Sequence, residues 1–382
     1  MSQSRLFYIT SSFYPRIGGA ENQTLQILKL LAESNSFSTI VWTTKETGLS
    51  SREILFGFEI RRLGIPWLPG KLRVLSFLAH LSVEILKISK PKSAVLHVLG
   101  TNSHYLCALF WKTFLGYSLI CRIRREGPGA DLEKMITKFG KSLASKLFRK
   151  TDTFVVLTSS MQKSAILKGI GKDSTLLIPN GVDTSRFHPI GIEEKSFLRN
   201  KFNLPESARI ACTISRLIPR KNLKVLISAI SQISHLDLHF LIVGSGPELD
   251  RLQVFVDHHS LEDKIHFISE ISFSEVHQLY QLSDLYLSAS ESEGMSNSLL
   301  EAISCGCFPL YFYTPGIEEI LHSKHLVHQN DTQTWTLRLQ DTLEIELGAY
   351  DFDFDDWRAE FSLEAVANSY HKLYQQKMDM TP

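Results

Sequence analysis

Short apolar runs separated by amphipathic stretches recur along the whole chain, and this alternation constrains the fold more than any other feature. The runs are about five residues long and the stretches between them about 12 to 20 residues, which is typical of a parallel sheet covered by helices. We therefore expect an α/β fold. Strands are predicted at 6–10, 38–43, 57–62, 94–98, 118–123, 153–157, 174–178, 209–213, 238–243, 264–268, 284–288, 308–312 and 325–328. Helices are predicted near 20–34, 72–89, 102–115, 131–150, 159–168, 222–234, 247–258, 273–282, 297–304, 330–346 and 356–377.

A chain of 382 residues is longer than one hydrophobic core supports comfortably, so two domains are expected. A turn-forming cluster at 179–183, followed by a polar stretch at 191–201, predicts the hinge between them. The expected parts are an N-terminal domain at 1–182, a C-terminal domain at 183–350 and a segment at 351–382 whose helix crosses back to the first domain. Each domain is predicted to be doubly wound, so a ligand is expected where strand carboxyl ends open into a crevice between the domains.

Charge is segregated along the chain, although the net charge is only +1. Residues 1–180 carry 25 Lys/Arg and 11 Asp/Glu, a net charge of +14, whereas residues 181–382 carry 16 and 29, a net charge of −13. A basic first half would attract an anionic acceptor or surface, and salt would screen that attraction. The alternative is that opposite charges help the two domains to dock.

Cysteine usage and apolar run lengths predict the compartment. No apolar run approaches the roughly 18 residues that cross a bilayer, and the first residues resemble a strand and not a secretory signal. Five cysteines, an odd number that lie mostly in apolar segments, are typical of free thiols in a reducing compartment. We therefore expect a cytoplasmic protein, peripheral at most at the inner face of a membrane. Cys305 and Cys307 lack a second Cys/His pair at zinc spacing, so no metal site is predicted.

The first motif is a glycine pair, Gly18 and Gly19, in a loop between the first strand and a helix that is predicted to begin near Ala20. Glycines there let the backbone approach a ligand closely, and the amides at a helix start favour an anion. Such a pair is equally consistent with a simple turn.

The second motif is a cationic loop, Ser215 to Asn222, which lies between a predicted strand and a helix. Arg216 and Lys221 can clamp neighbouring phosphate groups, the first as a planar fork and the second as a point charge. A cation at a helix N-terminus opposes the helix dipole, which is unfavourable unless an anion binds there. The alternative is a solvated loop.

The third motif carries two carboxylates, Glu293 and Glu301, on either side of a predicted helix start. Ser296 or Asn297 is a good N-cap, so the helix begins between the two acids. The amides of Ser298 and Leu299 would face a diphosphate, Glu301 could accept hydrogen bonds from a ribose diol, and Glu293 could accept one from a sugar hydroxyl. A capping box explains one acid near the helix start but not both.

The three loops together resemble the retaining glycosyltransferases of family 4, which have the GT-B fold. The likeness covers nearly the whole chain and is strongest from 175 to 320. The matching elements are the glycine loop at Gly18-Gly19-Ala20, the Arg-x4-Lys element at Arg216–Lys221, the E-x7-E motif at Glu293–Glu301, and the segments 178–183 and 241–247.

This resemblance implies two facing Rossmann-like doubly wound domains with an interdomain cleft, and transfer of a hexose-type sugar from a UDP- or GDP-sugar to a glycan or lipid-linked acceptor. The first domain would bind the acceptor and the second the donor, in polysaccharide or glycolipid biosynthesis, with neither a metal nor another cofactor and no nucleic-acid partner. Arg216 and Lys221 would hold the diphosphate and Glu301 the ribose, while Gly18 and Gly19 would close on the phosphates. The transferred sugar would be held by Glu293 and by the backbone of Gly294, Met295, Ser296 and Asn297.

Two positions depart from the family pattern. The family often has a His-x-His segment whose second histidine touches the donor sugar, and this chain has His97 followed two positions later by Leu99. His97 is therefore predicted as a catalytic residue, with a strand-end histidine bound to backbone as the alternative. A family glycine near the base pocket is replaced around Ser269, so the resemblance does not specify the nucleotide base.

Two further segments suggest other chemistry. Residues 351–356 contain a D-x-D pattern that some glycosyltransferases use for manganese, but they precede the last predicted helix, where acids favour a helix start. Residues 132–150 form a predicted basic amphipathic helix, which would either lie on an anionic membrane or pack on its own sheet. The competing functions are a nucleotide-sugar epimerase on the same scaffold and a non-catalytic scaffold protein with this fold.

Overall fold

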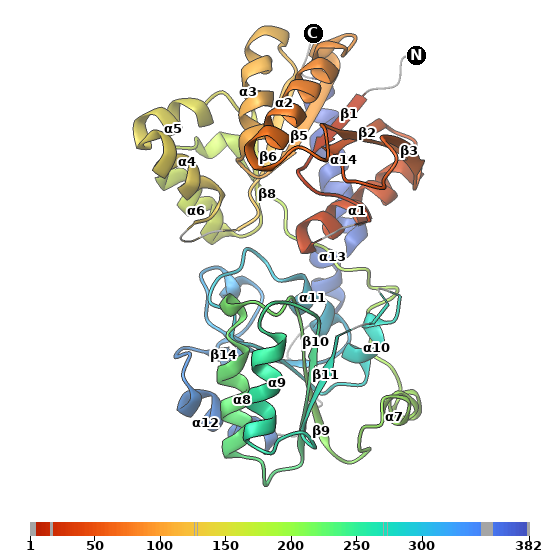
Figure 1. Cartoon of the computed structure of the whole chain (residues 1–382), viewed down its shortest axis with the longest axis vertical. Helices are drawn as coiled ribbons and strands as arrows, with labels where there is room; N and C mark the ends of the chain where they lie inside the picture. Colours follow the sequence, from red (N-terminus) through yellow and green to blue (C-terminus); the bar gives the residue numbers. More distant parts are fainter. Residues whose placement is uncertain are drawn as a thin grey trace. The chain divides into compact units, whose positions relative to one another are not determined.

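The computed structural model describes residues 5–15, 18–125, 127, 129–269, 271–272, 274–344 and 354–379. The chain forms two compact units, coloured along the sequence in Figure 1. Unit 1 comprises Met1–Gly181 and Leu363–Pro382, and unit 2 comprises Val182–Ser362. The chain therefore passes between the units twice, after Gly181 and after Ser362. These two crossing segments are joined, because Val182 forms an isolated parallel bridge with Ser362 and its amide donates to Phe361 O.

Unit 1 contains an eight-stranded sheet with the order β3-β4-β2-β1-β5-β6-β7-β8. All neighbours are parallel except β3 and β4. Strand order reverses on either side of β1, so the carboxyl end of β1 is a topological switch point. The strands are β1 (Arg5–Ile9), β2 (Ser38–Thr44), β3 (Arg52–Leu55), β4 (Phe58–Leu63), β5 (Ala94–Leu99), β6 (Ser118–Arg122), β7 (Thr153–Val156) and β8 (Thr175–Leu177).

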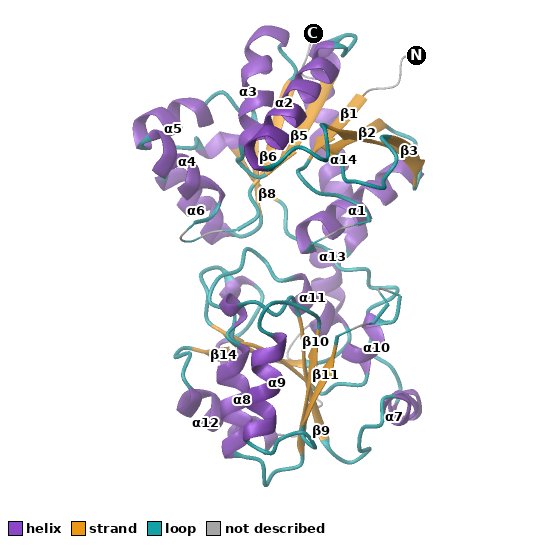
Figure 2. Ribbon diagram, viewed as in Figure 1, coloured by secondary structure: helices purple, strands orange, loops and turns teal. Residues whose placement is uncertain are grey.

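Helices cover both faces of this sheet (Figure 2). On one face α1 and α14 pack against each other, and on the other face α2 and α3 lie side by side. Because both faces are covered, the central strands are almost entirely apolar, and in β5 every residue is buried, His97 included. The helices are α1 (Gly19–Glu33), α2 (Gly70–Leu86), α3 (Ser103–Leu115), α4 (Asp131–Phe139), α5 (Lys141–Phe148), α6 (Ser159–Leu167) and α14 (Leu363–Asp379).

Unit 2 contains a six-stranded parallel sheet with the order β11-β10-β9-β12-β13-β14. Order reverses between β9 and β12, which makes the crevice outside their carboxyl ends the switch point of this unit. The strands are β9 (Arg209–Ile214), β10 (Leu238–Val243), β11 (Ile265–Ile268), β12 (Leu285–Ser288), β13 (Phe308–Phe312) and β14 (Leu326–Val327). The helices are α7 (Ile192–Lys201), α8 (Leu223–Gln232), α9 (Leu249–His258), α10 (Val276–Gln281), α11 (Asn297–Ser304), α12 (Thr332–Leu343) and α13 (Phe354–Phe361).

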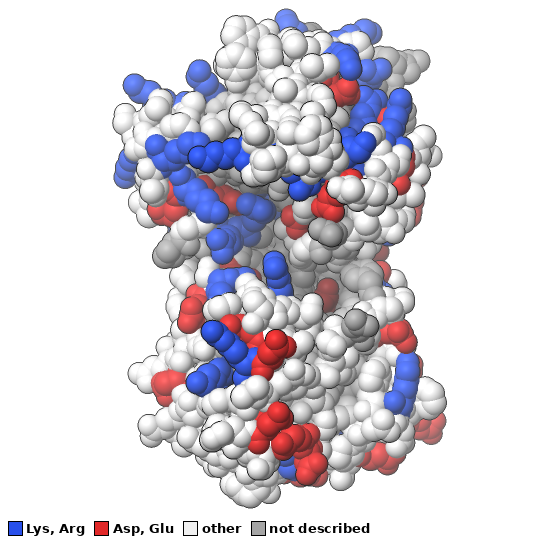
Figure 3. Space-filling view, in the orientation of Figure 1, with Lys and Arg blue, Asp and Glu red and all other residues white. Residues whose placement is uncertain are grey.

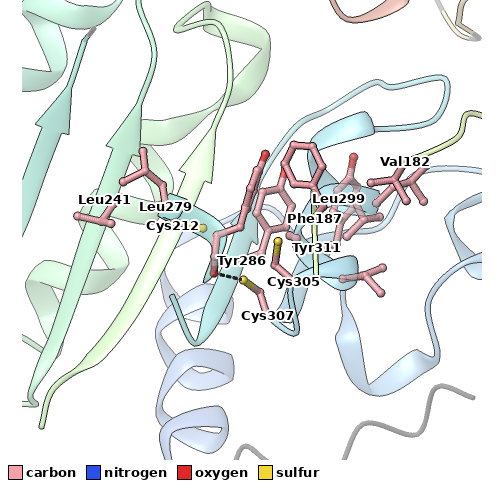
Figure 4. Close-up of a cluster of buried hydrophobic side chains, with 14 of the residues drawn as sticks. Val182, Phe187, Cys212, Leu241, Leu279, Tyr286, Leu299, Cys305, Cys307 and Tyr311 are labelled. Carbon is pink, nitrogen blue, oxygen red and sulfur yellow. Dashed lines mark hydrogen bonds between the residues drawn. The ribbon is translucent and has the colours of Figure 1, made fainter. Parts of the chain in front are cut away.

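Two apolar cores, one on each face of the sheet, hold unit 2 together. The first lies under α8, α9 and α12. The second lies under α10 and α11 and includes Tyr286, Leu299 and the cysteines Cys212, Cys305 and Cys307 (Figure 4). The thiol of Cys307 donates to Tyr280 O at 3.1 Å. All five cysteines are free.

The α/β fold class predicted from the alternating pattern is confirmed, while three local predictions are wrong and one strand was missed. The polar stretch at 191–201 is helix α7 and not a linker. Edge strand β3 was not predicted. The single helix expected at 131–150 is two helices, because Gly140 between α4 and α5 has φ 76° and ψ 154°, which no helix accepts. The helix expected at 356–377 is likewise two, with α13 in unit 2 and α14 in unit 1.

The division between the units falls one residue before the predicted boundary at 182/183. The predicted end of the second domain at 350, and most of the D-x-D segment at 351–356, lie outside the described residues. Among the residues that are described, no group of three or more His, Cys, Asp or Glu side chains could hold a metal ion.

Candidate active site

Two loops meet at the switch point of unit 2. One runs from Ser215 to Asn222 between β9 and α8, and the other runs from Ala289 to Ser296 between β12 and α11. A backbone hydrogen bond joins them, from Glu291 N to Arg220 O at 3.1 Å. Parallel strands bring their carboxyl ends to the same sheet edge, so neighbouring β9 and β12 deliver both loops to one place.

The centre of this site is an ion pair between the two loops. Lys221 Nζ lies 2.6 Å from Glu293 Oε1, and both side chains are mostly buried. Ser290 Oγ donates to the same carboxylate oxygen at 2.7 Å. Burial works against ionisation of Glu293, but the charges of Lys221 and Arg220 outweigh it and hold the pKa of this carboxyl below its usual value. Glu293 is therefore ionised at neutral pH.

Arg220 is a third member of the cluster and was not among the predicted site residues. Its guanidinium donates to Ser292 O, lies 3.3 Å from Ser290 Oγ and lies 3.1 Å from Glu293 Oε1. It thus holds the backbone of the Glu293 loop as well as its carboxylate. The available signal was the Arg220-Lys221 dipeptide, because a second cation next to Lys221 can pair with the same acidic partner.

Arg216 has no such partner. Its side chain is exposed and forms neither a hydrogen bond nor an ion pair with any described residue. Its loop is nevertheless packed tightly, because a Cβ at Gly244 would lie 2.0 Å from Ser215 O and one at Gly246 would lie 2.2 Å from Leu217 O. These two glycines allow the loop after β10 to press against the cationic loop.

The helix start at the second loop is capped as predicted from the sequence. Ser296 is the N-cap of α11, and its Oγ accepts from Leu299 N at 3.3 Å. Ser298 Oγ donates to Ile214 O at 2.8 Å, which fixes the first turn of α11 to the end of β9. Gly294, Met295 and the helix start therefore lie beside the Lys221–Glu293 pair, with the positive end of the helix dipole directed toward the loop.

Glu301 lies one turn into α11 and interacts with a different element. Its Oε2 accepts from the hydroxyl of Tyr280 on α10 at 2.9 Å. Burial raises the pKa of this carboxyl above its usual value, although the Tyr280 hydrogen bond and the positive charge of Arg186 act in the opposite direction. The two glutamates predicted to act together thus have pKa shifts of opposite sign, because only Glu293 is paired directly with cations.

In unit 1, the glycine loop lies at the switch point after β1. Gly18 is the N-cap of α1 and Gly19 its first residue, one position before the predicted start. Residues 16 and 17 lie outside the described residues. The loop therefore leads into a helix N-terminus, which is the placement that an anion site requires.

His97 was predicted as a catalytic residue, but the structure does not place it at an open surface. This burial corrects the prediction. His97 lies in the central strand β5 and is 1% exposed. Its Nδ1 is 2.7 Å from the hydroxyl of Tyr374 on α14, and its ring packs against Tyr8 and Tyr370. Burial, helped by the positive charge of Arg122, lowers the pKa of His97 to about 3, so the ring is neutral. The alternative interpretation as a strand-end histidine bound to backbone is also wrong, because the partner is a tyrosine side chain.

Two family models match the chain in succession. The model described as Glycosyltransferase Family 4 matches residues 17–186, and the model described as Glycosyl transferases group 1 matches residues 194–351. The chain belongs to the GT-B glycosyltransferases of family 4. The predicted family, fold and enzyme class are thereby confirmed.

Similar curated proteins and solved structures agree with this assignment. A subunit of the Arabidopsis thaliana phosphatidylinositol N-acetylglucosaminyltransferase is 23% identical over 83% of this glycosyltransferase and 69% of its own length. A Mycobacterium tuberculosis GDP-mannose-dependent α-(1-6)-phosphatidylinositol monomannoside mannosyltransferase is 23% identical over 79% of each chain. This glycosyltransferase spans 63% of the length of the corresponding human protein and 40% of the length of its yeast counterpart, GPI3.

Among solved structures, sucrose-phosphate synthase from Thermosynechococcus elongatus superimposes with a TM-score of 0.82, 18% identity and 98% coverage of both chains. HepE from Anabaena, in complex with UDP and glucose, superimposes with a TM-score of 0.74, 16% identity, and coverage of 97% of this chain and 99% of its own. At these identities the likeness shows the fold alone.

Proposed function

We propose that this glycosyltransferase transfers a hexosyl group from a UDP- or GDP-sugar to a lipid-linked acceptor, with retention of anomeric configuration. The observation that carries the donor half of this proposal is the cluster at the switch point of unit 2. Arg216 is a cation without a described partner, Lys221 is a cation beside it, and a helix start faces the same loop. Neighbouring cations and helix-end amides are suited to a diphosphate.

In this proposal, Arg216 and Lys221 bind the diphosphate and stabilise the charge that develops on it as its bond to the sugar C1 breaks. The ammonium of Lys221 must then donate hydrogen bonds to the phosphate oxygens as well as to Glu293. Glu293 and the backbone from Gly294 to Asn297 hold the sugar hydroxyls, and Glu301 accepts hydrogen bonds from the ribose diol. The new bond joins C1 to the acceptor oxygen, whose proton leaves with the departing diphosphate.

The acceptor class is supported by the relatives and by charge. The names of the Arabidopsis and Mycobacterium relatives both specify phosphatidylinositol-based acceptors. The basic first half of the chain suits the phosphate of such a head group. A growing polysaccharide is the competing acceptor. We also propose a cytoplasmic location, supported by five free cysteines.

A donor and acceptor screen tests the proposal. UDP-glucose, UDP-N-acetylglucosamine and GDP-mannose are each incubated with the purified chain, with or without phosphatidylinositol vesicles. We expect release of free nucleoside diphosphate from one donor, at a rate that rises at least about tenfold with the acceptor. The anomeric proton coupling in the product lipid, measured by NMR, should match that of the donor sugar.

The other outcomes of this screen contradict the proposal. A new nucleotide sugar with no free nucleotide would indicate an epimerase. In a thermal-shift assay run beside the screen, the absence of any shift with UDP or GDP would indicate a scaffold protein. Stimulation by an oligosaccharide in place of the lipid would transfer the acceptor assignment to a polysaccharide.

Arg220 provides a prediction about positioning. Arg220→Ala removes the contacts to Ser292 O and Glu293, so we expect the donor KM to rise about 10- to 100-fold, since hydrogen bonds to charged groups contribute about 1.5–3 kcal/mol. The Kd for the free nucleoside diphosphate should stay unchanged, because Arg220 positions the sugar-binding loop and not the phosphates. Arg251→Ala, at an exposed arginine on α9, is the matched control. A rise in both constants would show that Arg220 itself binds phosphate.

A further inference from the structure

Helix α2 of unit 1 has an apolar outer face. Its inner face buries Phe77, Leu81 and Ile85 against the sheet. The opposite side, at helical spacing, presents Leu72, Leu75, Ala79, Val83 and Leu86, all exposed. A helix on a protein surface normally turns polar residues toward water, and a helix that is apolar all round normally has a second apolar partner.

Helix α3 extends this surface. Phe110 and Phe114, one turn apart with ring centroids 5.3 Å from each other, are both exposed. The two helices are in direct contact, since Ser82 Oγ lies 3.4 Å from Cys107 Sγ. Seven large apolar side chains, each between 47% and 77% exposed, thus form what we call the α2–α3 face: Trp67, Leu72, Leu75, Val83, Leu86, Phe110 and Phe114.

The charge around the α2–α3 face is of one sign. Residues 64–117 contain six Lys/Arg and a single acid, Glu84. Glu84 is already neutralised, because its carboxylate pairs with Arg61 and lies 2.9 Å from Lys87 Nζ. Figure 3 shows a largely uncharged surface over α2 and α3, with Lys and Arg at its margins. The exposed cations lie at both ends of α2: Lys71, Lys87, Lys90 and Lys92.

We propose that the α2–α3 face docks on an anionic lipid bilayer, with α2 lying in the interface. An apolar helix face rimmed by Lys/Arg, with an exposed tryptophan beside it, matches the chemistry of that boundary. A second copy of this chain fits less well, because a two-fold contact would place the same basic rim against itself. No described helix has the length and apolarity to cross a membrane.

The basic segment 132–150 is a weaker membrane surface than the α2–α3 face. Of the predicted apolar stripe, helices α4 and α5 bury Leu132 and Met135 in unit 1 and partly bury Ile136, Phe139 and Leu147. Only Leu143 remains as a large exposed apolar side chain. Of the two interpretations of this segment, packing on its own sheet is therefore the one that the burial supports.

The proposal concerns unit 1 alone and goes beyond the proposed function, since it holds whichever acceptor is used. Flotation of the full chain with vesicles tests it. We expect binding to phosphatidylcholine vesicles with about one-third phosphatidylglycerol at low salt, and binding at least about tenfold weaker when the anionic lipid is omitted, as the loss of several Lys/Arg attractions predicts.

Paired substitutions distinguish vesicle binding through the α2–α3 face from non-specific hydrophobic adsorption. Leu75→Ser with Phe114→Ser removes two exposed apolar side chains and should weaken vesicle binding at least about tenfold. Ile192→Ser with Phe197→Ser, at side chains 88% and 68% exposed on α7 of unit 2, is the matched control and should bind as the wild type does. Both pairs lie at exposed positions, and unchanged melting temperatures check that the fold is intact.

Trp67 provides a direct readout, since it is 77% exposed and precedes α2. Brominated acyl chains should quench the wild-type fluorescence on vesicle binding. Trp67→Phe should lose the part of that quenching that Trp67 contributes, while Trp111, which packs against Phe110 and Phe114, reports the rest. Equal vesicle binding by the α2–α3 face variant and by the α7 control variant would overturn the proposal. The proposal would also be overturned if the wild type fails to bind vesicles and instead forms a dimer in sedimentation analysis, and if Leu75→Ser with Phe114→Ser dissociates that dimer. Transfer to a water-soluble acceptor should be unaffected, so this test can fail while the proposed function stands.

Discussion

Lys221→Ala is expected to lower kcat by about 10²- to 10³-fold, because a preorganised charge aimed at a developing anion contributes about that much. Lys221 lies in the loop between β9 and α8, with its ammonium 2.6 Å from Glu293 Oε1. Removing it leaves the diphosphate with Arg216 alone. Initial rates of nucleoside diphosphate release at saturating donor and acceptor measure the effect.

Stability controls are needed, since the substitution also removes a partner of a mostly buried carboxylate. Breaking a fully buried pair costs about 3–5 kcal/mol, and the cost here should be smaller because Arg220 stays within 3.1 Å of Glu293. Lys224→Ala, at an exposed lysine on the first turn of α8, is the matched control and should leave kcat unchanged. A folded Lys221→Ala variant with wild-type kcat would refute the role of this cation.

Lys221→Met combined with Glu293→Gln separates charge from folding. This double variant removes both members of the ion pair, so its stability should approach that of the wild type more closely than Lys221→Ala does. Its activity should remain low, because the positive charge near the diphosphate is still missing. Recovered activity in the double variant would mean that Lys221 serves only to neutralise Glu293.

The strand-to-loop-to-helix units of the site were predictable from the sequence. Strand β10 begins and ends at the predicted residues, 238 and 243, and Ser296 caps α11 as expected. These features depend on residues close together in the chain. Apolar runs define parallel strands, and a serine before an apolar helix defines its start.

The pairing of side chains across loops was not predictable in this way. Lys221 and Glu293 are 72 positions apart, and each was predicted to bind a different part of the donor. Their contact depends on β9 and β12 being neighbours, which the strand order decides and the local pattern does not. The same holds for Arg220, whose partners all lie on the second loop.

His97 illustrates an error that the sequence could have prevented. It stands within the apolar run 94–99, and a central strand of a parallel sheet is buried on both faces. A histidine in the middle of such a run is expected to be neutral and covered. Its partner Tyr374 comes from the last helix, 277 positions away, and no local pattern could identify it.

Glu301→Gln is expected to lower kcat/KM for the donor by about 10- to 100-fold, as loss of a charged acceptor for a ribose diol predicts. Because burial raises the pKa of Glu301, the wild-type kcat/KM should fall as pH decreases through that raised value, where the carboxylate gains a proton. The variant should lack this inflection. Rates measured with the donor below KM, from pH 5 to about 8, provide the test.

As pH rises, the contribution of Glu301 to the free energy of unfolding should fall, whereas kcat/KM should rise. A carboxyl whose folded pKa lies above its unfolded pKa binds protons more tightly when folded, so its favourable contribution is present at low pH and is lost as pH rises through the folded value. Glu301→Gln should therefore be at least as stable as the wild type at neutral pH. Tyr280→Phe removes a hydrogen bond that lowers this pKa, so it should move the inflection of kcat/KM to higher pH. An unmoved inflection would assign it to a group other than Glu301.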